Sequence, residues 1–548
     1  MTNPDLHAVA FPTLSEAHFA ALAGCPLTRH LSAADGETLF HVGQRDCTFF
    51  VVKSGAIEIV DKSGDAPKRV TLHGPGEFTG DVTALTGEPS LVAGVARGPT
   101  DVYAISPEAL KEILNHYPSI ADVILNGFIA RRQLLRELGD FTGPRVIGSR
   151  YSTDTFRVRE FLAKNRVLFT WLDLEADPAV KKLLDAFHLT EADTPVVAWG
   201  PRYIRNPSNH ELAEVLGVGR PVERKVYDFA VVGAGPAGLA AAVYAASEGL
   251  STVVLERVAP GGQAGRSMRI ENYLGFPTGI TGSELAERAT LQANKFGARI
   301  SVASGVQSLS FDGLLSVLHL DTGEAVTAKS LLVATGADYR LLGVAGCEQY
   351  EGRGVYYAAT PMEAQMCAGS EVVVVGGGNS AGQAAVFLAG QVKKVSVVIR
   401  GDALSKSMSS YLAKRIEQTA NIALLKNAEI RAMHGDGHLS AVEVFDDRTG
   451  QTTRIETPAV FSFIGAVPRT DWLPPEIERD EKCFVRTGPA AALSPKWTAK
   501  RPPFLLETTR RGVFAAGDVR SGSVKRVASA VGEGSMTVQF VHEHLKDV

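Results

Sequence analysis

Two stretches of the chain each place a short apolar strand, a glycine-rich turn and a helix of small residues in that order. They read YDFAVVGAGPAGLAAAVYAASEGL at residues 227–250 and EVVVVGGGNSAGQAAVFLAG at residues 371–390. A strand that ends in such a turn and leads into a helix is typical of a dinucleotide-binding βαβ unit. The two turns lie about 140 residues apart, near one domain length. The sequence therefore predicts an α/β protein with two such units.

Each glycine of the first turn has a different predicted role. Gly233 permits the tight turn, Gly235 lets the backbone approach a pyrophosphate, and Gly238 lets helix and strand pack closely. The N-terminus of the helix offers free N–H groups to the phosphates. Glu256 lies 18 residues beyond Gly238 and ends the next strand, where a carboxylate accepts hydrogen bonds from ribose hydroxyls. The alternative is a glycine turn of purely structural origin.

The second turn has Gly376, Gly378 and Ala381 at the same spacing, but its next strand ends in Arg400 instead of an acid. A cation there favours the 2′-phosphate of NADPH over the free ribose of NADH. The alternative is a solvated surface charge. One tightly held redox cofactor and one hydride donor explain two dinucleotide sites in one chain, so the pattern indicates a flavoprotein that oxidises a pyridine nucleotide.

Composition excludes several classes of protein. The 548 residues are 45% hydrophobic and 21% charged, enough for several folded domains, and the net charge of −4 argues against a nucleic-acid or anionic-membrane binder. No apolar run is long enough to cross a bilayer and the first residues lack signal-peptide order, so we expect a soluble cytoplasmic protein. The five cysteines form no CxxC, which excludes a local dithiol and the commonest zinc pairing, and we expect no metal site.

The residues before the first turn divide into two segments. Short β-branched and aromatic runs at 37–40, 49–52, 57–60, 70–72 and 102–105 predict a small β-barrel or sandwich, and apolar residues over 110–138 recur at helical spacing. Residues 145–217 alternate between strand and helix patterns, as in a small βαβα unit, and 217–225 is a Gly/Pro/charge linker. We predict domains at 1–140, 145–222, 226–340 with 468–548, and 341–467.

Residues 226–548 resemble the low-molecular-weight thioredoxin reductases. The resemblance rests on VVGAGPAGLAA, PGGQA, IENYLGFP, LLVATGADYR and GVFAAGDV, spaced as in that family. It implies an FAD domain interrupted by an NADPH domain. The positions it assigns to FAD are Gly233, Gly235, Pro236, Ala237, Gly238, Glu256, Gly262, Gln263, Asn272, Val306, Ala334, Thr335, Gly336, Gly517, Asp518, Lys525, Arg526 and Val527.

The resemblance also implies a pyridine-nucleotide site around the second turn. Its positions are Gly376, Gly378, Asn379, Ser380, Ala381, Arg400 and Lys406. The family's His-Arg-Arg for the 2′-phosphate reads Ile399, Arg400 and Gly401 here, with Lys406 as a second cation.

The chain departs from that family at the redox dithiol. The two cysteine positions of the family correspond to Ala358 and Pro361 in GVYYAATPMEA, and neither side chain can exchange electrons with a disulfide. Cys367 lies nearby but is single, and we interpret it as a small buried apolar residue.

The two leading segments have resemblances of their own. GETLFHVGQRDCTFFVVKSGAIEIV and GEFTGDVTALTGEPSLVAGVA resemble a cyclic nucleotide-binding domain. Asp81 aligns with its ribose-binding Glu, and Ser90 with its phosphate-binding Arg, so we expect weak cyclic nucleotide binding. Residues 145–217 are similar to a thioredoxin or glutaredoxin fold, with Pro195 at its cis-proline position, but SRYSTDTF carries no sulfur, which implies docking or spacing.

These features support two hypotheses. In the first, the chain is an enzyme in which NADPH, or NADH, reduces FAD, and electrons pass directly to an acceptor such as a quinone, a ferredoxin-like protein or oxygen. In the second, it is a ligand-responsive sensor with structural FAD and negligible turnover. No side chain is identified as catalytic. A small-molecule effector at the N-terminal segment and a homodimer are further expectations.

Overall fold

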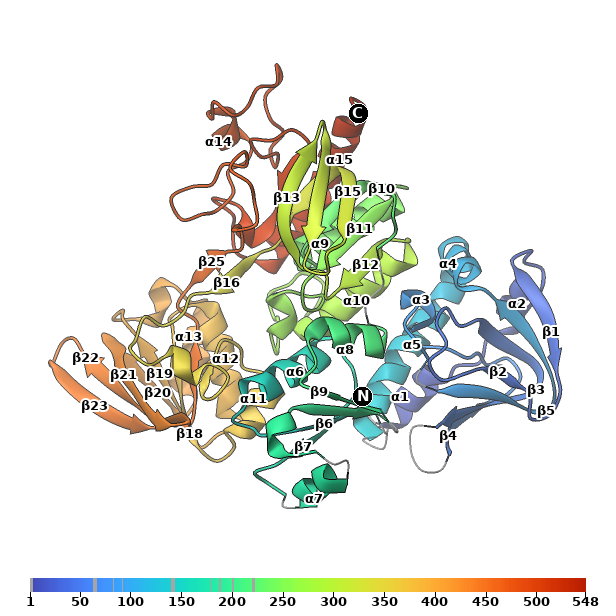
Figure 1. Cartoon of the computed structure of the whole chain (residues 1–548), viewed down its shortest axis with the longest axis horizontal. Helices are drawn as coiled ribbons and strands as arrows, with labels where there is room; N and C mark the ends of the chain where they lie inside the picture. Colours follow the sequence, from blue (N-terminus) through green and yellow to red (C-terminus); the bar gives the residue numbers. More distant parts are fainter. Residues whose placement is uncertain are drawn as a thin grey trace.

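The computed structural model describes residues 3–62, 67–81, 83–90, 92–138, 143–177, 179–186, 189–199, 202–218 and 222–548. The expected domain boundary at residue 140 and residues 219–221 of the expected linker lie outside this set. Figure 1 shows four parts, which we call the N-terminal unit (3–138), the middle unit (143–218), the first glycine-loop unit (226–340 and 468–548) and the second glycine-loop unit (341–467).

The N-terminal unit is built on an antiparallel sheet in the order β1-β5-β3-β4, with β2 beside β5. Its strands are β1 (Thr28–Ala33), β2 (Thr38–Phe40), β3 (Phe49–Asp61), β4 (Lys68–His73) and β5 (Ala93–Ile105). The separate strands expected at 49–52 and 57–60 are one strand, β3. Gly55 lets β3 continue through a register shift, because it has φ +77° and a Cβ there would lie 2.5 Å from the Pro99 carbonyl oxygen.

Helices pack against this sheet, most of them toward the rest of the molecule and the second of them on the outer side beside β1 (Figure 1). They are α1 (Asn3–Ala10), α2 (Glu16–Ala23), α3 (Thr83–Thr86), α4 (Pro107–His116) and α5 (Pro118–Leu138). The helical pattern expected over 110–138 is divided between α4 and α5, because Pro118 cannot continue the hydrogen bonding of α4 and instead begins α5.

The middle unit has the sheet order β7-β6-β8-β9, in which β6 and β7 are parallel and the other pairs antiparallel. Its elements are β6 (Arg145–Gly148), α6 (Thr153–Lys164), β7 (Thr170–Asp173), α7 (Ala179–Ala186), the 3₁₀ helix η1 (Glu191–Asp193), β8 (Val196–Trp199), β9 (Arg202–Arg205) and α8 (Asn209–Leu216). The sequence did not predict β9 and α8. The Thr194–Pro195 peptide bond is cis.

The first glycine-loop unit contains a sheet in the order β12-β11-β10-β15-β14-β13, with β26 beside β15. Its strands are β10 (Val226–Val232), β11 (Thr252–Glu256), β12 (Arg299–Val302), β13 (Val306–Asp312), β14 (Leu315–Leu320), β15 (Ala325–Val333) and β26 (Val513–Ala515). Its helices are α9 (Pro236–Ser247), η2 (Ala264–Arg266), α10 (Gly282–Lys295), α14 (Pro489–Ala492), η5 (Gly517–Val519) and α15 (Val527–Leu545). Because β26 joins β15 from the far end of the sequence, the other glycine-loop unit is an insertion in this one.

The second glycine-loop unit has a parallel sheet in the order β17-β24-β18-β19-β20 and an antiparallel sheet β21-β22-β23. Its elements are η3 (Glu348–Tyr350), β17 (Val355–Tyr356), α11 (Pro361–Met366), β18 (Glu371–Val375), α12 (Asn379–Ala389), β19 (Lys394–Ile399), η4 (Leu404–Lys406), α13 (Ser410–Gln418), β20 (Ile422–Lys426), β21 (Ala428–Asp436), β22 (His438–Asp446), β23 (Gln451–Glu456) and β24 (Val460–Ser462). The antiparallel pair β16 (Ala337–Tyr339) and β25 (Ala466–Pro468) connects it to the first glycine-loop unit.

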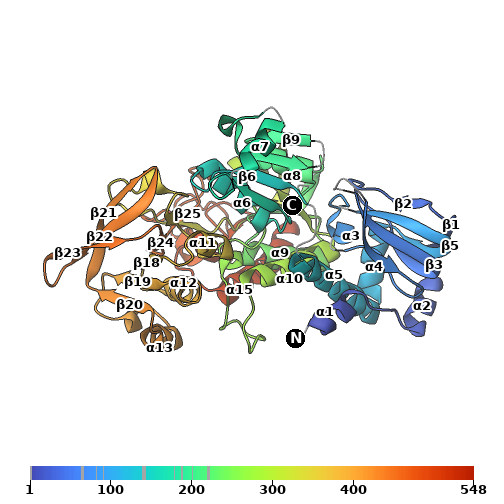
Figure 2. The same ribbon diagram turned by 90° about the horizontal axis from the view of Figure 1, so that it is seen from below.

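Both leading units pack on the first glycine-loop unit, as the two views show (Figures 1 and 2). One apolar core contains Val146 and Phe161 of the middle unit together with Leu239 of α9. Leu291 of α10 belongs to the core of the N-terminal unit. In the described part of the chain, no helix, including the 21-residue α5, joins enough length with enough apolar character to span a membrane.

Candidate dinucleotide sites and the unit interfaces

The first glycine turn joins β10 to α9. Gly233 has φ +103°, and a Cβ on it would collide with the Ala334 carbonyl oxygen at the end of β15. A Cβ on Gly238 would collide with the Gly233 carbonyl oxygen. These two glycines are therefore required for close packing between turn, strand and helix.

Gly235 is different, because it faces open space at the start of α9. It is the N-cap residue, no side chain caps the helix there, and a Cβ would meet only the Gly262 Cα, at 4.0 Å. The backbone N–H groups of the residues that follow Pro236 in the first turn of α9 have no hydrogen-bond acceptor within the helix. Space in front of uncapped amides is what a pyrophosphate needs.

Other predicted residues converge on this turn from distant parts of the chain. Gly262 lies against Gly235, since a Cβ on it would be 3.0 Å from the Gly235 Cα. Gly517 lies against Ala237, at 3.2 Å from its Cβ by the same measure. The Gln263 side-chain amide donates to the Ala337 carbonyl, and the Thr335 hydroxyl donates to Arg469 at 2.8 Å. Gly336 lies between Thr335 and Ala337 in the chain.

Glu256 ends β11 beside the turn, as predicted for a ribose-binding acid. Its carboxylate accepts hydrogen bonds from the backbone N–H groups of Ala234 at 2.8 Å and Val258 at 2.9 Å, which fix its position. The Glu256 carbonyl accepts from Ser304, two residues before Val306. The structure thus brings Val306 to the same strand end.

The remaining predicted residues surround this region less closely. Asn272 is exposed on the loop after η2. Burial raises the pKa of the Asp518 carboxyl, which Lys525 opposes and Glu533 reinforces. The Lys525 ammonium donates to the Asp518 carbonyl at 3.0 Å, and Arg526 and Val527 form the start of α15.

The second glycine turn has the same construction. A Cβ on Gly376 would lie 2.5 Å from the Phe463 carbonyl oxygen, whereas Gly378, the N-cap residue of α12, has no atom within 4 Å of its Cβ position and no side-chain cap. Ala381 is fully buried, and the Asn379 side chain accepts from the Ser409 N–H at 2.7 Å. Uncapped amides again face open space.

The two predicted cations at this turn differ in availability. Arg400 directly follows β19, is exposed, and makes no side-chain hydrogen bond or ion pair with any described residue. Lys406, expected to be a second cation, is already paired with the Asp402 carboxylate at 2.8 Å. This pairing leaves less of its positive charge for a 2′-phosphate, and the role of Lys406 stays a prediction.

Tyr339, the last residue of β16, brings the connection between the two units next to the second turn. Burial raises the pKa of the Tyr339 hydroxyl, opposed by the charge of Arg266 and by a hydrogen bond with Ser380. Ser380 belongs to the first turn of α12, and Arg266 lies three residues after Gln263. An ion pair of 3.1 Å between Arg415 and Glu271 joins the same two units.

The positions expected for a dithiol contain no sulfur and lie at a unit interface. Ala358 is buried and Pro361 begins α11. The ring of Phe156, on α6 of the middle unit, contacts that of Tyr356 with 5.7 Å between centroids. The five cysteines are free, and burial raises the pKa of the Cys367 thiol to about 12, so Cys367 is not a thiolate at neutral pH.

The nucleotide-binding positions expected in the N-terminal unit are engaged internally. The Asp81 carboxylate accepts from the Thr83 N–H at 2.8 Å. Ser90 is buried, and its hydroxyl donates to the Val92 carbonyl at 2.8 Å. The nearby buried Arg131 donates to the carbonyls of Ala10, Phe78 and Gly80.

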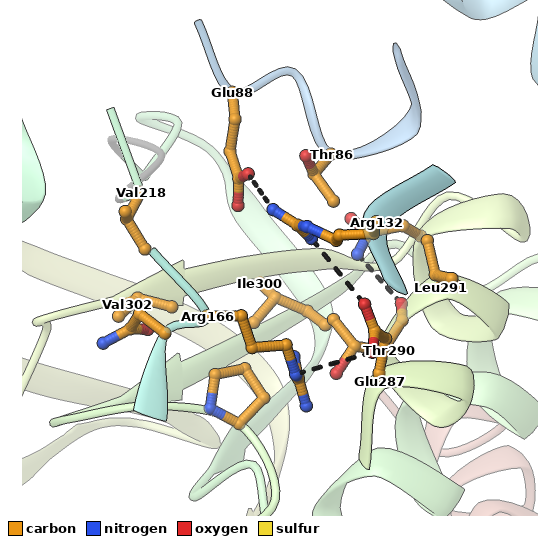
Figure 3. Close-up of a pocket in the computed structure, with 13 residues that line it drawn as sticks. Thr86, Glu88, Arg132, Arg166, Val218, Glu287, Thr290, Leu291, Ile300 and Val302 are labelled. Carbon is orange, nitrogen blue, oxygen red and sulfur yellow. Dashed lines mark hydrogen bonds and ion pairs between the residues drawn. The ribbon is translucent and has the colours of Figure 1, made fainter. Parts of the chain in front are cut away.

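A charged cluster that the sequence did not predict joins three units (Figure 3). Arg132 of α5 lies 3.5 Å from the Glu88 carboxylate of the N-terminal unit and 3.9 Å from Glu287 of α10. Arg166 of the middle unit is 3.9 Å from the other oxygen of Glu287. Although burial opposes it, these carboxylates raise the pKa of Arg132. We call these four residues the Arg132 cluster.

Comparison with known proteins defines the class. Residues 227–534, more than half of the chain, match the family model described as pyridine nucleotide-disulphide oxidoreductase. The chain belongs to this family. Residues 30–117 match the model of the cyclic nucleotide-binding domain, so the N-terminal unit contains such a domain.

Several similar proteins are named thioredoxin reductases. The chain is 37% identical to thioredoxin reductase of Treponema pallidum over 320 residues, covering 58% of this chain and 97% of the relative. It is 33% identical over 327 residues to that of Bacillus subtilis, covering 60% of this chain and 97% of the relative. The crystal structure of T. acidophilum thioredoxin reductase matches with a TM-score of 0.53 and 32% identity, covering 59% of this chain and 99% of that one. This chain is thus a thioredoxin reductase-like flavoprotein oxidoreductase.

Proposed function

We propose that this chain oxidises NAD(P)H with bound FAD and passes the electrons to an acceptor other than a protein disulfide. One observation carries the proposal. Two uncapped helix N-termini face open space at Gly235 and Gly378, whereas Ala358 and Pro361 stand where a dithiol would be expected.

The residues at the first turn fit FAD. Open space in front of α9 suits the pyrophosphate, and Glu256, held by Ala234 and Val258, keeps further lone pairs for the ribose. Asp518 and Lys525 are proposed to bind the part of the cofactor nearer the flavin. When bound, FAD supplies the ability to accept a hydride and release electrons singly or in pairs. The protein binds and orients it.

The residues at the second turn fit NADPH. Open space in front of α12 suits its pyrophosphate, and the unpaired Arg400 offers a guanidinium to the 2′-phosphate. The hydrogen bond between Ser380 and Tyr339 ties this turn to β16, the connection to the first glycine-loop unit. This link supports the proposed transfer between the two nucleotides.

The acceptor is proposed to be a small molecule or a redox protein that reaches the flavin directly. A disulfide reductase needs a thiolate to attack its substrate. Ala358 and Pro361 have no thiol, and Cys367 is buried with a raised thiol pKa.

We also propose regulation through the N-terminal unit. The Arg132 cluster links Glu88, in the segment that resembles a nucleotide-binding cassette, to Glu287 on α10 (Figure 3). The first residue of α10, Gly282, donates its N–H to Ser267, close to the Gly262–Gln263 segment. An effector that moves the cassette would therefore act on an element that borders the FAD site.

The middle unit is proposed to be a thioredoxin-like docking element. Its sheet order, β7-β6-β8-β9, with α6 between β6 and β7, agrees with that fold. The loop before α6, which would carry the cysteines, instead places Tyr151 against His438 with ring centroids 4.4 Å apart. In this arrangement the middle unit covers the part of the second glycine-loop unit that contains His438 and Tyr356.

A sensor with negligible turnover is the second candidate, favoured by the link between the cassette and α10. Anaerobic rapid mixing of the FAD-loaded protein with NADPH separates the two. Fast loss of the visible flavin absorbance supports the oxidoreductase. Flavin that stays oxidised over minutes would contradict it and favour the sensor.

A further inference from the structure

A cavity of about 640 Å³ lies between the middle unit and the second glycine-loop unit. Arg150 and Tyr151 line it from the middle unit, and Arg353, Lys393 and His438 are among its lining residues on the other side. The volume is within the range of small-molecule sites, about 300–1,000 Å³, and such sites occur preferentially between domains.

This cavity is separate from the second glycine turn. Its lining includes Glu371 and Lys394, the first residues of β18 and β19. Gly376 and Arg400 follow the last residues of the same two parallel strands. At about 3.3 Å per residue, the length of β18 places the two sites roughly 17 Å apart, on opposite edges of the sheet.

The charged groups around the cavity leave an excess of positive charge. The Arg150 guanidinium is paired with Asp173 at 2.5 Å, and the Lys394 ammonium with Glu371 at 2.9 Å. The remaining acid of the lining, Glu456, accepts from Arg454 at 2.7 Å.

Two cations of the lining have no such partner. Among the described residues, neither Arg353 nor Lys393 makes a side-chain hydrogen bond or ion pair, and the Arg353 Nε is buried without an acceptor. A buried donor without an acceptor is costly, so a bound anion would stabilise it. The guanidinium of Arg353 suits carboxylate and phosphate oxygens, which it can bind in pairs.

The lining also includes apolar and aromatic side chains, together with Ser370, Ser440 and Thr457. Tyr356, Cys367 and Leu439 are buried there, and the stacked pair of Tyr151 and His438 stands at the boundary between the two units. Burial keeps the Cys367 thiol protonated at neutral pH, so this cavity has no thiolate for covalent chemistry.

We propose that this cavity is a binding site for a small organic anion, a carboxylate or phosphate ester on an aromatic or apolar body. Arg353 and Lys393 bind the anionic group, and the body packs against Tyr356 and Leu439. Because the lining comes from both units, the occupant stabilises the middle unit against the second glycine-loop unit. The proposal does not depend on FAD, NADPH or turnover.

The test is calorimetric titration of the full-length protein, saturated with NADP⁺, with phenyl phosphate and, separately, with benzoate. At least one of the two anions should bind, at one site per chain. The difference between their affinities shows whether the site takes a phosphate ester or a carboxylate. Benzyl alcohol, which lacks the charge, should bind at least tenfold more weakly. Arg353→Gln and Lys393→Gln should each weaken binding of the anion at least tenfold.

Lys414→Gln is the matched control, because Lys414 is an exposed lysine of the same unit on α13, and it should bind as the wild type does. Lys393 is exposed, so its substitution leaves folding intact even if Arg353→Gln does not. The proposal fails if neither anion binds at 10 mM (roughly the weakest affinity worth testing for a fragment), if an anion binds only in a parallel titration without NADP⁺, or if Lys393→Gln binds it normally.

Discussion

Gly235 and Gly378 hold equivalent places at the starts of α9 and α12. Each is an N-cap residue without a side-chain cap, and each faces space that a Cβ would enter without collision. Substitution by Asp therefore tests ligand binding more than folding, because the carboxylate would cap the helix and repel a pyrophosphate.

We predict that the two Asp variants fail in different ways. Gly235→Asp should be purified without FAD and be colourless. Gly378→Asp should keep FAD but lose at least tenfold in NADPH affinity. Absorbance spectra and NADPH titration measure both effects, and each variant is the folding control for the other. A Gly235→Asp protein with full flavin content would contradict the assignment of the first turn.

Arg400 is the cation that the structure leaves available for a 2′-phosphate. Arg400→Ala should weaken NADPH more than NADH by about 1.5–3 kcal/mol, roughly 10- to 150-fold, the usual loss for a charged hydrogen bond. Steady-state titrations with both nucleotides measure it. Lys406→Ala should change the ratio less than about fivefold, since Lys406 already pairs with Asp402 on the surface. Equal losses for both nucleotides in Arg400→Ala would remove Arg400 from the site.

Individual residues also show which parts of the site the sequence could predict and which it could not. Glu256 and Gly378 could be predicted because their tasks are local to one strand–turn–helix unit. The pairing of Lys406 with Asp402 depends on how η4 turns after β19. The Arg132 cluster could not be predicted, because its members come from three units and meet only after these units pack.

Helices α9 and α15 are the elements whose packing shapes the first turn. A Cβ on Gly534 of α15 would collide with the Ala237 carbonyl oxygen in the first turn of α9. Gly534→Ala should therefore push the two helices apart, lower the melting temperature by several degrees and reduce FAD content. A shift of this size corresponds to about 1–3 kcal/mol from overpacking.

The same helix offers a matched control. Gly532 is exposed, and its Cβ position has no atom within 4 Å. Gly532→Ala should keep FAD content and raise stability slightly, because Ala favours the helix by up to about 1 kcal/mol. Calorimetry and flavin content of the two variants separate packing from helix propensity. Equal behaviour of the two variants would refute the packing argument.

At the level of elements, continuous apolar strands next to glycine turns were predictable, as β10 with α9 and β18 with α12 illustrate. The edge strand β1 and the full length of β3 were not predictable. β1 is polar and mostly exposed, so it lacks the alternation that marks a strand. β3 passes through Gly55, which the sequence alone presents as a turn. α8 is short, but the capping box formed by Ser208 and Glu211 is a sequence signal that marks its start.

The whole molecule combines a thioredoxin reductase-like body with a cyclic nucleotide-binding domain and a middle unit that packs on both. The core shared by Phe161 and Leu239, and the ring contact of Phe156 with Tyr356, attach the middle unit to both glycine-loop units. The thiol on this face, that of Cys367, is buried, and Ala358 and Pro361 carry none. If electrons leave as we propose, the route depends on how the units are assembled and not on one motif.

The final prediction concerns the route by which electrons leave. NADPH-dependent reduction of thioredoxin should be absent, while reduction of a quinone or ferricyanide should proceed, because these acceptors need no dithiol. A variant with all five cysteines replaced by alanine or serine should keep most of the quinone activity. The free state of these cysteines and the raised pKa of the buried Cys367 thiol support this expectation.

The cysteine-free variant must first match the wild type in flavin content and thermal unfolding, since three of the replaced side chains are buried: Cys25, Cys347 and Cys367. Turnover with ferricyanide is then compared between the two folded, FAD-loaded proteins. If the folded variant loses its activity while anaerobic flavin reduction by NADPH stays normal, a thiol acts after the flavin, and electron transfer directly from flavin to acceptor must be abandoned. If both rates are retained, electrons leave the flavin without a cysteine.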